Sequence, residues 1–160
     1  MFKEFNGLPA HALLVHAAVV LVPLLALVSV AYGVLPRWRP RLDWAVAALA
    51  ITAPIAAFLA TESGEALEHV LEQKNYPAQI LDKVREHSEY GESLRSFTFG
   101  LAAAALLLLL VTSGFARVRN LPRWIAPVLT GVVAVLAVFA VVYVYLAGDT
   151  GAQAVWGGTL

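Results

Sequence analysis

Four histidines and several carboxylates are the side chains of this sequence that could bind a metal ion or a cofactor. Imidazole nitrogen combined with carboxylate oxygen suits zinc, iron, manganese or copper. Glu65 and His69 are four residues apart, so on a helix they would lie on one face and could chelate a divalent ion. The candidate ligands predicted for one such site are His11, His16, Glu65, His69, His87, Glu92 and Asp149.

His16 is the candidate that an ordinary solvated position explains least well. It lies on the order of 12 Å along a helix from Leu8, and a polar side chain at that depth in a membrane needs a partner inside the protein. His11 and His16 are five residues apart, which is roughly 140° of helical rotation, so they cannot share one face. We expect only one of the two to be central.

A b-type haem with two axial histidines is the alternative to a metal ion, and His16 with His87 is the pair that the sequence favours. A further alternative has no cofactor. The chain would then be a structural accessory subunit of a larger membrane complex, such as a respiratory one, or a homo-oligomer. Its histidines would be hydrogen-bonded core groups. None of these alternatives assigns a catalytic residue.

The elements that must position these residues are helices that cross a membrane. The chain has 160 residues, of which 60% are hydrophobic and only 14% are charged, whereas soluble domains carry about 25% charged residues. Four stretches lack charged residues and can each cross a bilayer. We therefore predict one all-α domain over residues 1–160, a four-helix transmembrane bundle with spans at about residues 9–35, 43–62, 94–116 and 124–147.

The arginines predict how this bundle is oriented. Two short connections are rich in arginine, and by the positive-inside rule they face the cytoplasm. Both termini, most of the carboxylates and all four histidines then belong to the outer half. The arginines concerned are Arg37, Arg39 and Arg41 in the first connection and Arg117, Arg119 and Arg123 in the third.

The segment between the second and third spans is predicted to form two short amphipathic helices. Leu67, Val70 and Leu71 form one apolar stripe, and Ile80, Leu81 and Val84 form another. The first resembles an extension of span two and the second a lead-in to span three, with a break at Asn75-Tyr76-Pro77.

Two further patterns concern packing and internal organisation. Within span two, residues Ala48, Thr52, Ala56 and Ala60 recur at intervals of four and predict a helix packed closely inside the bundle. We expect no internal repeat.

Composition and missing motifs exclude several functions. Eleven basic and eleven acidic residues leave no net positive charge for nucleic-acid binding. The absence of cysteine excludes disulfides, thiolate nucleophiles and cysteine-held metal clusters. No Gly-rich phosphate loop, nucleophile elbow or zinc-protease motif occurs, so no independent enzyme is predicted. The one certain partner is the lipid bilayer.

Four segments together resemble, in order and spacing, the bacterial four-span family known as domain of unknown function 2231. They are residues 7–16, 61–68, 87–92 and 148–157. The resemblance implies a multi-pass protein of the bacterial plasma (inner) membrane. Some similar proteins are fused to Rieske iron–sulfur domains, which implies redox surroundings.

The resemblance also implies particular residues. The two amino-terminal histidines of the family fall on His11 and His16, its Gly-Glu pair on Gly64 and Glu65, and its loop histidine on His87. Two positions depart from the pattern, because Ala12 replaces a proline and Asp149 stands where similar proteins often have histidine. Aspartate is a poor haem ligand, so this departure favours a metal ion at an outer-face histidine and carboxylate site.

Overall fold

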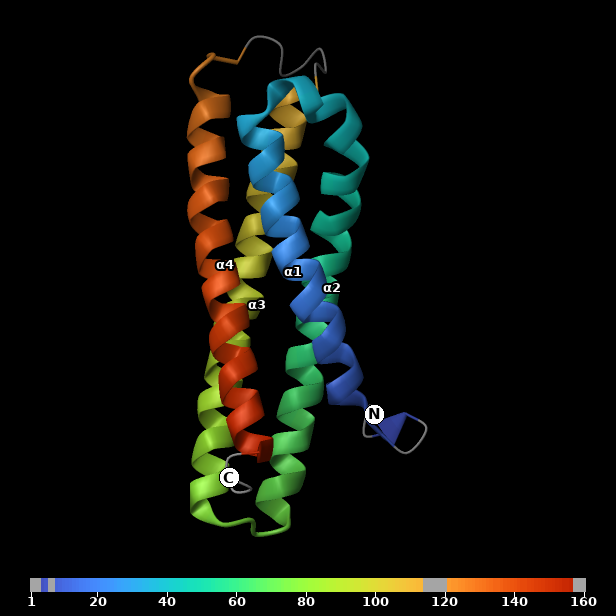
Figure 1. Ribbon diagram of the computed structural model, residues 1–160, viewed down its shortest axis with the longest axis vertical. Helices are drawn as coiled ribbons and strands as arrows, with labels where there is room; N and C mark the ends of the chain where they lie inside the picture. Colours follow the sequence, from blue (N-terminus) through green and yellow to red (C-terminus); the bar gives the residue numbers. More distant parts are fainter. Residues whose placement is uncertain (1–3, 6–7, 114–120, 157–160) are drawn as a thin grey trace.

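The computed structural model, which describes residues 4–5, 8–113 and 121–156, contains four long helices in one bundle (Figure 1). All four are long and apolar enough to cross a membrane, so the predicted all-α architecture with four candidate spans is confirmed. The helices are α1 (Ala10–Val34), α2 (Arg39–Gln73), α3 (Ala78–Thr112) and α4 (Ile125–Trp156). A 3-10 turn, η1 (Pro36–Trp38), and two strands, β1 (Glu4–Phe5) and β2 (Leu8–Pro9), complete the described elements.

The four helices follow one another around the bundle. Each packs against its neighbours in sequence, and α4 closes the ring against α1, so α1 and α3 face each other diagonally. The start of α1 and the end of α4 lie at the same end of the bundle (Figure 1). The two short strands pair antiparallel before α1, with Glu4 opposite Pro9.

α2 and α3 are longer than a bilayer requires. Each has 35 residues, which is roughly 50 Å of helix against about 30 Å of hydrocarbon. The segment predicted to form two short helices is the end of α2 and the start of α3. The first is expected to extend span two and the second to lead into span three, and each is continuous with that helix. Four of the six stripe residues, Leu67, Leu71, Ile80 and Val84, line one cavity.

The turn between α2 and α3 is a helix stop of the Schellman type. Tyr76 N–H donates to the carbonyl of Leu71 and Asn75 N–H to that of Glu72, at 3.3 and 3.0 Å. Asn75 has a φ of 52°, a left-handed conformation that asparagine tolerates better than most residues. Pro77 follows and prevents the helix from continuing.

The alanine pattern of α2 is only partly buried as expected. Ala56 and Ala60 are buried, but Ala48 and Thr52 are exposed. The buried alanines nearer the arginine end are Ala50 and Ala53. An interval of four residues advances about 400° around a helix, so such a row drifts by about 40° per step. The row therefore leaves the interface within three steps.

The arginine-rich end of the bundle is tightly closed. Arg39 donates from Nε to the carbonyl of Tyr32 at 3.1 Å and from Nη2 to that of Gly33 at 3.2 Å. These bonds satisfy carbonyls at the end of α1. Of the arginines in the other loop, the structure describes Arg123. The following lie outside the described residues: Arg117 and Arg119, the end of the third predicted span, and Gly7 and Gly157 of the family pattern.

Candidate cofactor site between two histidines

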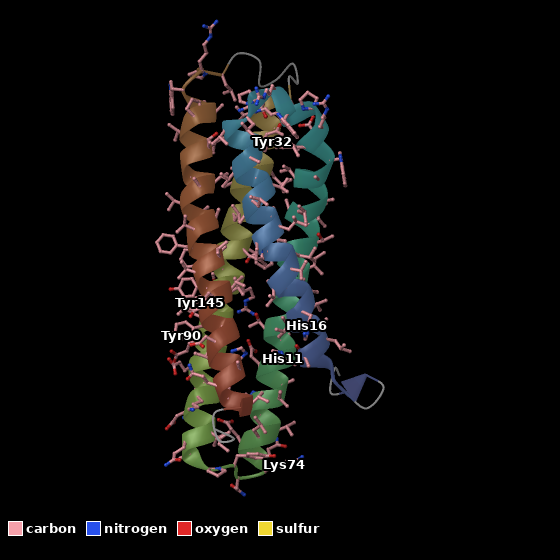
Figure 2. All side chains as sticks on the ribbon, in the orientation of Figure 1. His11, His16, Tyr32, Lys74, Tyr90 and Tyr145 are labelled. Atoms are coloured by element: carbon pink, nitrogen blue, oxygen red, sulfur yellow. The ribbon has the colours of Figure 1, made fainter. Side chains whose placement is uncertain are left out.

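Two histidines from diagonally opposed helices meet inside the bundle. The imidazoles of His11 on α1 and His87 on α3 have ring centroids 5.9 Å apart and planes at 79°. Figure 2 shows His11 on the amino-terminal part of α1, in the half of the bundle away from Tyr32. The two rings are far apart in sequence, so only the bundle can bring them together.

His11 is held by the adjacent helix α2. Its Nδ1 lies 3.0 Å from the carbonyl oxygen of Ala60 and 3.1 Å from Oγ of Ser63. The ring also packs on Gly64, where an added Cβ would lie 3.1 Å from His11 Cε1. Glycine is therefore the residue that leaves room for this ring.

His87 is held by α4 in the same way. Its Nδ1 lies 2.9 Å from the carbonyl oxygen of Ala147 and 3.4 Å from Oγ1 of Thr150. The ring packs on Gly151, where an added Cβ would lie 3.0 Å from His87 Cε1. Each histidine thus has a carbonyl, a hydroxyl and a glycine at the same relative positions of its neighbouring helix.

The sequence behind these two cradles is a short internal repeat, contrary to our expectation of none. Residues 59–64 read Leu-Ala-Thr-Glu-Ser-Gly, and residues 146–151 read Leu-Ala-Gly-Asp-Thr-Gly. The shared pattern is Leu-Ala, any residue, an acid, a hydroxyl and Gly. Comparing the ends of spans two and four would have revealed it, and with it the pairing of His11 and His87.

The hydrogen bonds fix which nitrogen of each ring is free. A carbonyl oxygen can only accept a hydrogen bond, so Nδ1 of both His11 and His87 must carry the hydrogen. The neutral imidazole then has its lone pair on Nε2. Histidines that ligate metals are commonly oriented by such a bond from the other ring nitrogen to a backbone carbonyl.

A cavity of about 500 Å³ adjoins both rings. All four helices line it, and nearly all of the lining is apolar, including Val15, Leu67, Leu94 and Val144. Its volume is within the usual range of cofactor and ligand pockets, about 300–1,000 Å³. Glycines or alanines of α2 and α4 form its walls next to the histidines, so it is open where the rings lie.

The structure separates the other predicted ligands from this pair. His16 borders the cavity, but its side chain is exposed and its Nδ1 bonds to the carbonyl of Ala12 on its own helix. Asp149 is exposed and accepts a hydrogen bond of 2.9 Å from Gln153. Of the two amino-terminal histidines, the structure brings His11 to His87, whereas the sequence favours His16.

Glu65, His69 and Glu92 line a second, shallower pocket between α2 and α3, of about 300 Å³. His69 lies 3.7 Å from Glu72, and Glu65 lies 3.9 Å from Arg95. Across the described residues, no group of three or more histidines, aspartates or glutamates is close enough to hold a metal ion. The expected convergence of imidazole and carboxylate ligands on one centre thus finds no geometric support there.

Ion pairs account for much of the acidic character of this end. Arg85 on α3 lies 3.0 Å from Glu72 and 3.9 Å from Glu68 on α2. Arg95 lies 3.4 Å from Glu62. These exposed pairs join α2 to α3, and such pairs contribute little to stability because water screens them.

Comparison with known proteins agrees with the architecture. The family model described as "Predicted membrane protein (DUF2231)" matches residues 7–160. Neither a curated protein nor a solved structure shows significant similarity to the chain. Because the family match covers nearly all of the sequence and the four helices suit a membrane, the protein belongs to this DUF2231 family of predicted membrane proteins.

Proposed function

We propose that this protein is a membrane b-type haem protein in which His11 and His87 are the two axial ligands. The observation that carries the proposal is the meeting of two imidazoles from opposed helices, each with Nδ1 bonded to a carbonyl of a neighbouring helix. Both rings are thereby oriented with Nε2 available, which is the state a ligating histidine needs.

The separation of the rings is compatible with one iron between them. An imidazole nitrogen binds a metal at about 2 Å, so two rings on opposite sides of one ion have centroids roughly 6 Å apart. The centroids of His11 and His87 are 5.9 Å apart. The centroid separation is therefore close to the value that two axial imidazoles would have.

The surroundings also suit a large apolar ring. The cavity of about 500 Å³ is lined mainly by aliphatic side chains and small residues. Gly64 and Gly151 flank the two imidazoles, and larger residues there would displace the rings. A four-helix bundle core fed by facing helices is a common place for such a site.

A bare metal ion is less well supported than haem. Two nitrogens leave a metal ion with too few protein ligands, because no third candidate joins them among the described residues. Haem supplies the other four nitrogens itself, so two histidines suffice. The aspartate at position 149 no longer argues against haem, because this side chain is exposed and bonds to Gln153 instead of facing the two histidines.

Haem with two histidine ligands would supply one-electron transfer. The chain's own residues would hold and orient the axial imidazoles and exclude water from the cavity. The two Nδ1–H bonds to Ala60 and Ala147 raise the basicity of the ligands. We therefore propose a role as an electron carrier in the membrane.

An absorbance spectrum of the purified protein tests this proposal. We expect a Soret band that sharpens and shifts on reduction, with one haem per chain. His11→Ala and His87→Ala should each lower haem content at least tenfold, whereas the matched variants His16→Ala and His69→Ala should keep it. Folding is checked by gel filtration and helical circular dichroism.

Three results would overturn the proposal in different ways. Stoichiometric zinc, iron or copper without a Soret band, lost on substitution of His16 or His87, would favour the metal-ion site. A colourless, metal-free protein that copurifies with a stoichiometric partner, unaffected by the histidine variants, would favour the accessory-subunit alternative. Haem content unchanged in both His11→Ala and His87→Ala would remove these residues as ligands.

A further inference from the structure

We infer that Ser63 and Thr150 are positioning residues that lock His11 and His87 in the Nδ1–H tautomer. The tautomers themselves do not depend on a cofactor. That the tautomers prepare Nε2 of each ring to bind haem rests on the proposed function.

The hydroxyl of Ser63 has no hydrogen to spare for His11. Ser63 is only 4% exposed, and its Oγ donates to the carbonyl of Ala60 at 2.8 Å. The oxygen therefore faces His11 Nδ1, at 3.1 Å, with a lone pair. Because Ala60 O also faces Nδ1, at 3.0 Å, two acceptors surround this one nitrogen.

Thr150 is committed in the same manner on α4. It is 9% exposed, and Oγ1 donates to the carbonyl of Leu146 at 2.8 Å, with Ala147 O at 3.3 Å. Its lone pair is thus left for Nδ1 of His87, at 3.4 Å. Nδ1 of His87 also faces the carbonyl of Ala147, at 2.9 Å.

The direction of the hydroxyl hydrogen decides whether the hydroxyl supports or opposes the Nδ1–H tautomer that the alanine carbonyl already favours. A serine or threonine free to rotate could donate to Nδ1 and stabilise the opposite tautomer, in which Nε2 carries the hydrogen and cannot ligate. Bonding each hydroxyl to its own helix removes that option. The repeated pattern of an alanine carbonyl, a hydroxyl three residues later and then glycine thus specifies both the orientation and the tautomer of the ring.

Nuclear magnetic resonance of haem-free protein labelled with ¹³C and ¹⁵N at histidine tests the inference directly, since ring carbon shifts report the tautomer. We expect Nδ1–H at both His11 and His87. Ser63→Ala leaves Nδ1 of His11 with one acceptor, the carbonyl of Ala60, instead of two, so the Nε2–H population should rise above its wild-type level at His11 only. Thr150→Val should have the same effect at His87 only. Ser63→Thr and Thr150→Ser should keep the original tautomers.

Thr98→Val is the matched control. Thr98 is fully buried on α3 and its hydroxyl bonds to the carbonyl of Leu94 at 2.7 Å. Its loss should leave both tautomers unchanged. In haem titrations, Ser63→Ala and Thr150→Val should weaken binding by about 10-fold, the lower end of the effect of outer-shell partners, whereas Thr98→Val should not.

The outcomes separate this inference from the proposed function. Tautomers that respond as expected in a protein that binds no haem would support the lock and contradict the haem proposal. Haem bound by His11 and His87, with tautomers and affinity indifferent to Ser63→Ala and Thr150→Val, would contradict the lock alone. Wild-type rings in the Nε2–H form would also overturn it.

Discussion

The imidazole of His11 lies nearly perpendicular to that of His87, with an angle of 79° between the ring planes. This angle follows from the two cradles. His11 is bonded to α2 and His87 to α4, two helices on opposite sides of the bundle, so each ring takes its orientation from a different wall. Any ligand held between the rings must accommodate crossed imidazole planes.

Crossed planes make a spectroscopic prediction for the haem-loaded protein. Nearly perpendicular axial imidazoles on ferric haem give a highly anisotropic low-spin electron paramagnetic resonance signal, whereas parallel planes give a rhombic one. We expect the anisotropic form from the wild-type protein at low temperature. A rhombic spectrum would show that the rings rotate on binding or that a different pair of histidines ligates.

The glycines beside the rings make a second prediction. In Gly151→Ala the new Cβ would lie 3.0 Å from His87 Cε1, so the ring must shift by a few tenths of an ångström. Gly148 lies on the same helix and borders the same cavity, and in Gly148→Ala the new Cβ would meet none of the described residues within 4 Å. Haem affinity should therefore fall by roughly 10-fold in Gly151→Ala and stay near wild type in Gly148→Ala.

Thermal unfolding of the haem-free variants provides the control. Alanine is favoured over glycine in a helix interior by about 0.5–1 kcal/mol, so Gly148→Ala should be at least as stable as wild type. Gly151→Ala should be stabilised less than Gly148→Ala, because crowding of the new Cβ against His87 offsets part of the helix-forming benefit of alanine. Equal haem affinity and equal stability in the two variants would contradict the close approach.

Much of the fold could be predicted from where charges are absent. Uncharged stretches located all four helices, and the apolar stripes of residues 62–95 indicated that α2 and α3 extend beyond the membrane. The stop at Asn75 and Pro77 was also visible. These features depend on local sequence alone, since burial in lipid and helix termination act over a few neighbouring residues.

The site was less predictable because it depends on how helices are rotated. His11 and His16 differ by roughly 140° around α1, and nothing local decides which of them faces His87. Depth favoured His16, but the packing of α1 on Ala60 and Gly64 selects His11. The predicted carboxylate ligands depend on rotation in the same way, since Glu65 lies 3.9 Å from Arg95 of α3 and Asp149 accepts a hydrogen bond from Gln153.

The orientation in the membrane is a third prediction, and the lack of native cysteine makes it easy to test. The positive-inside rule places Arg37 in the cytoplasm and Asp82, in the turn-proximal part of α3, outside. Both positions are exposed, so a single cysteine at either can be labelled with a membrane-impermeant maleimide. Asp82→Cys should react in intact cells, and Arg37→Cys should react only in inverted vesicles. Labelling of Asp82→Cys only in inverted vesicles would reverse the proposed topology.

A fourth prediction concerns the closed end of the bundle, where α1 and α4 meet. A Cβ added at Gly33 would lie 2.5 Å from Thr130 Cγ2 and 3.0 Å from its Oγ1. Gly33→Ala should therefore destabilise the protein by about 1–3 kcal/mol, as overpacking does, measured by unfolding in mixed micelles.

The neighbouring glycine supplies the comparison. Gly131→Ala on α4 would place its Cβ more than 4 Å from the rest of the part of the chain that the structure describes, so it should be neutral or stabilising by up to about 1 kcal/mol. Thr130→Ser removes the clashing Cγ2 and should restore much of the stability lost in Gly33→Ala. Stability of Gly33→Ala equal to that of Gly131→Ala would show that α1 and α4 are not packed so closely.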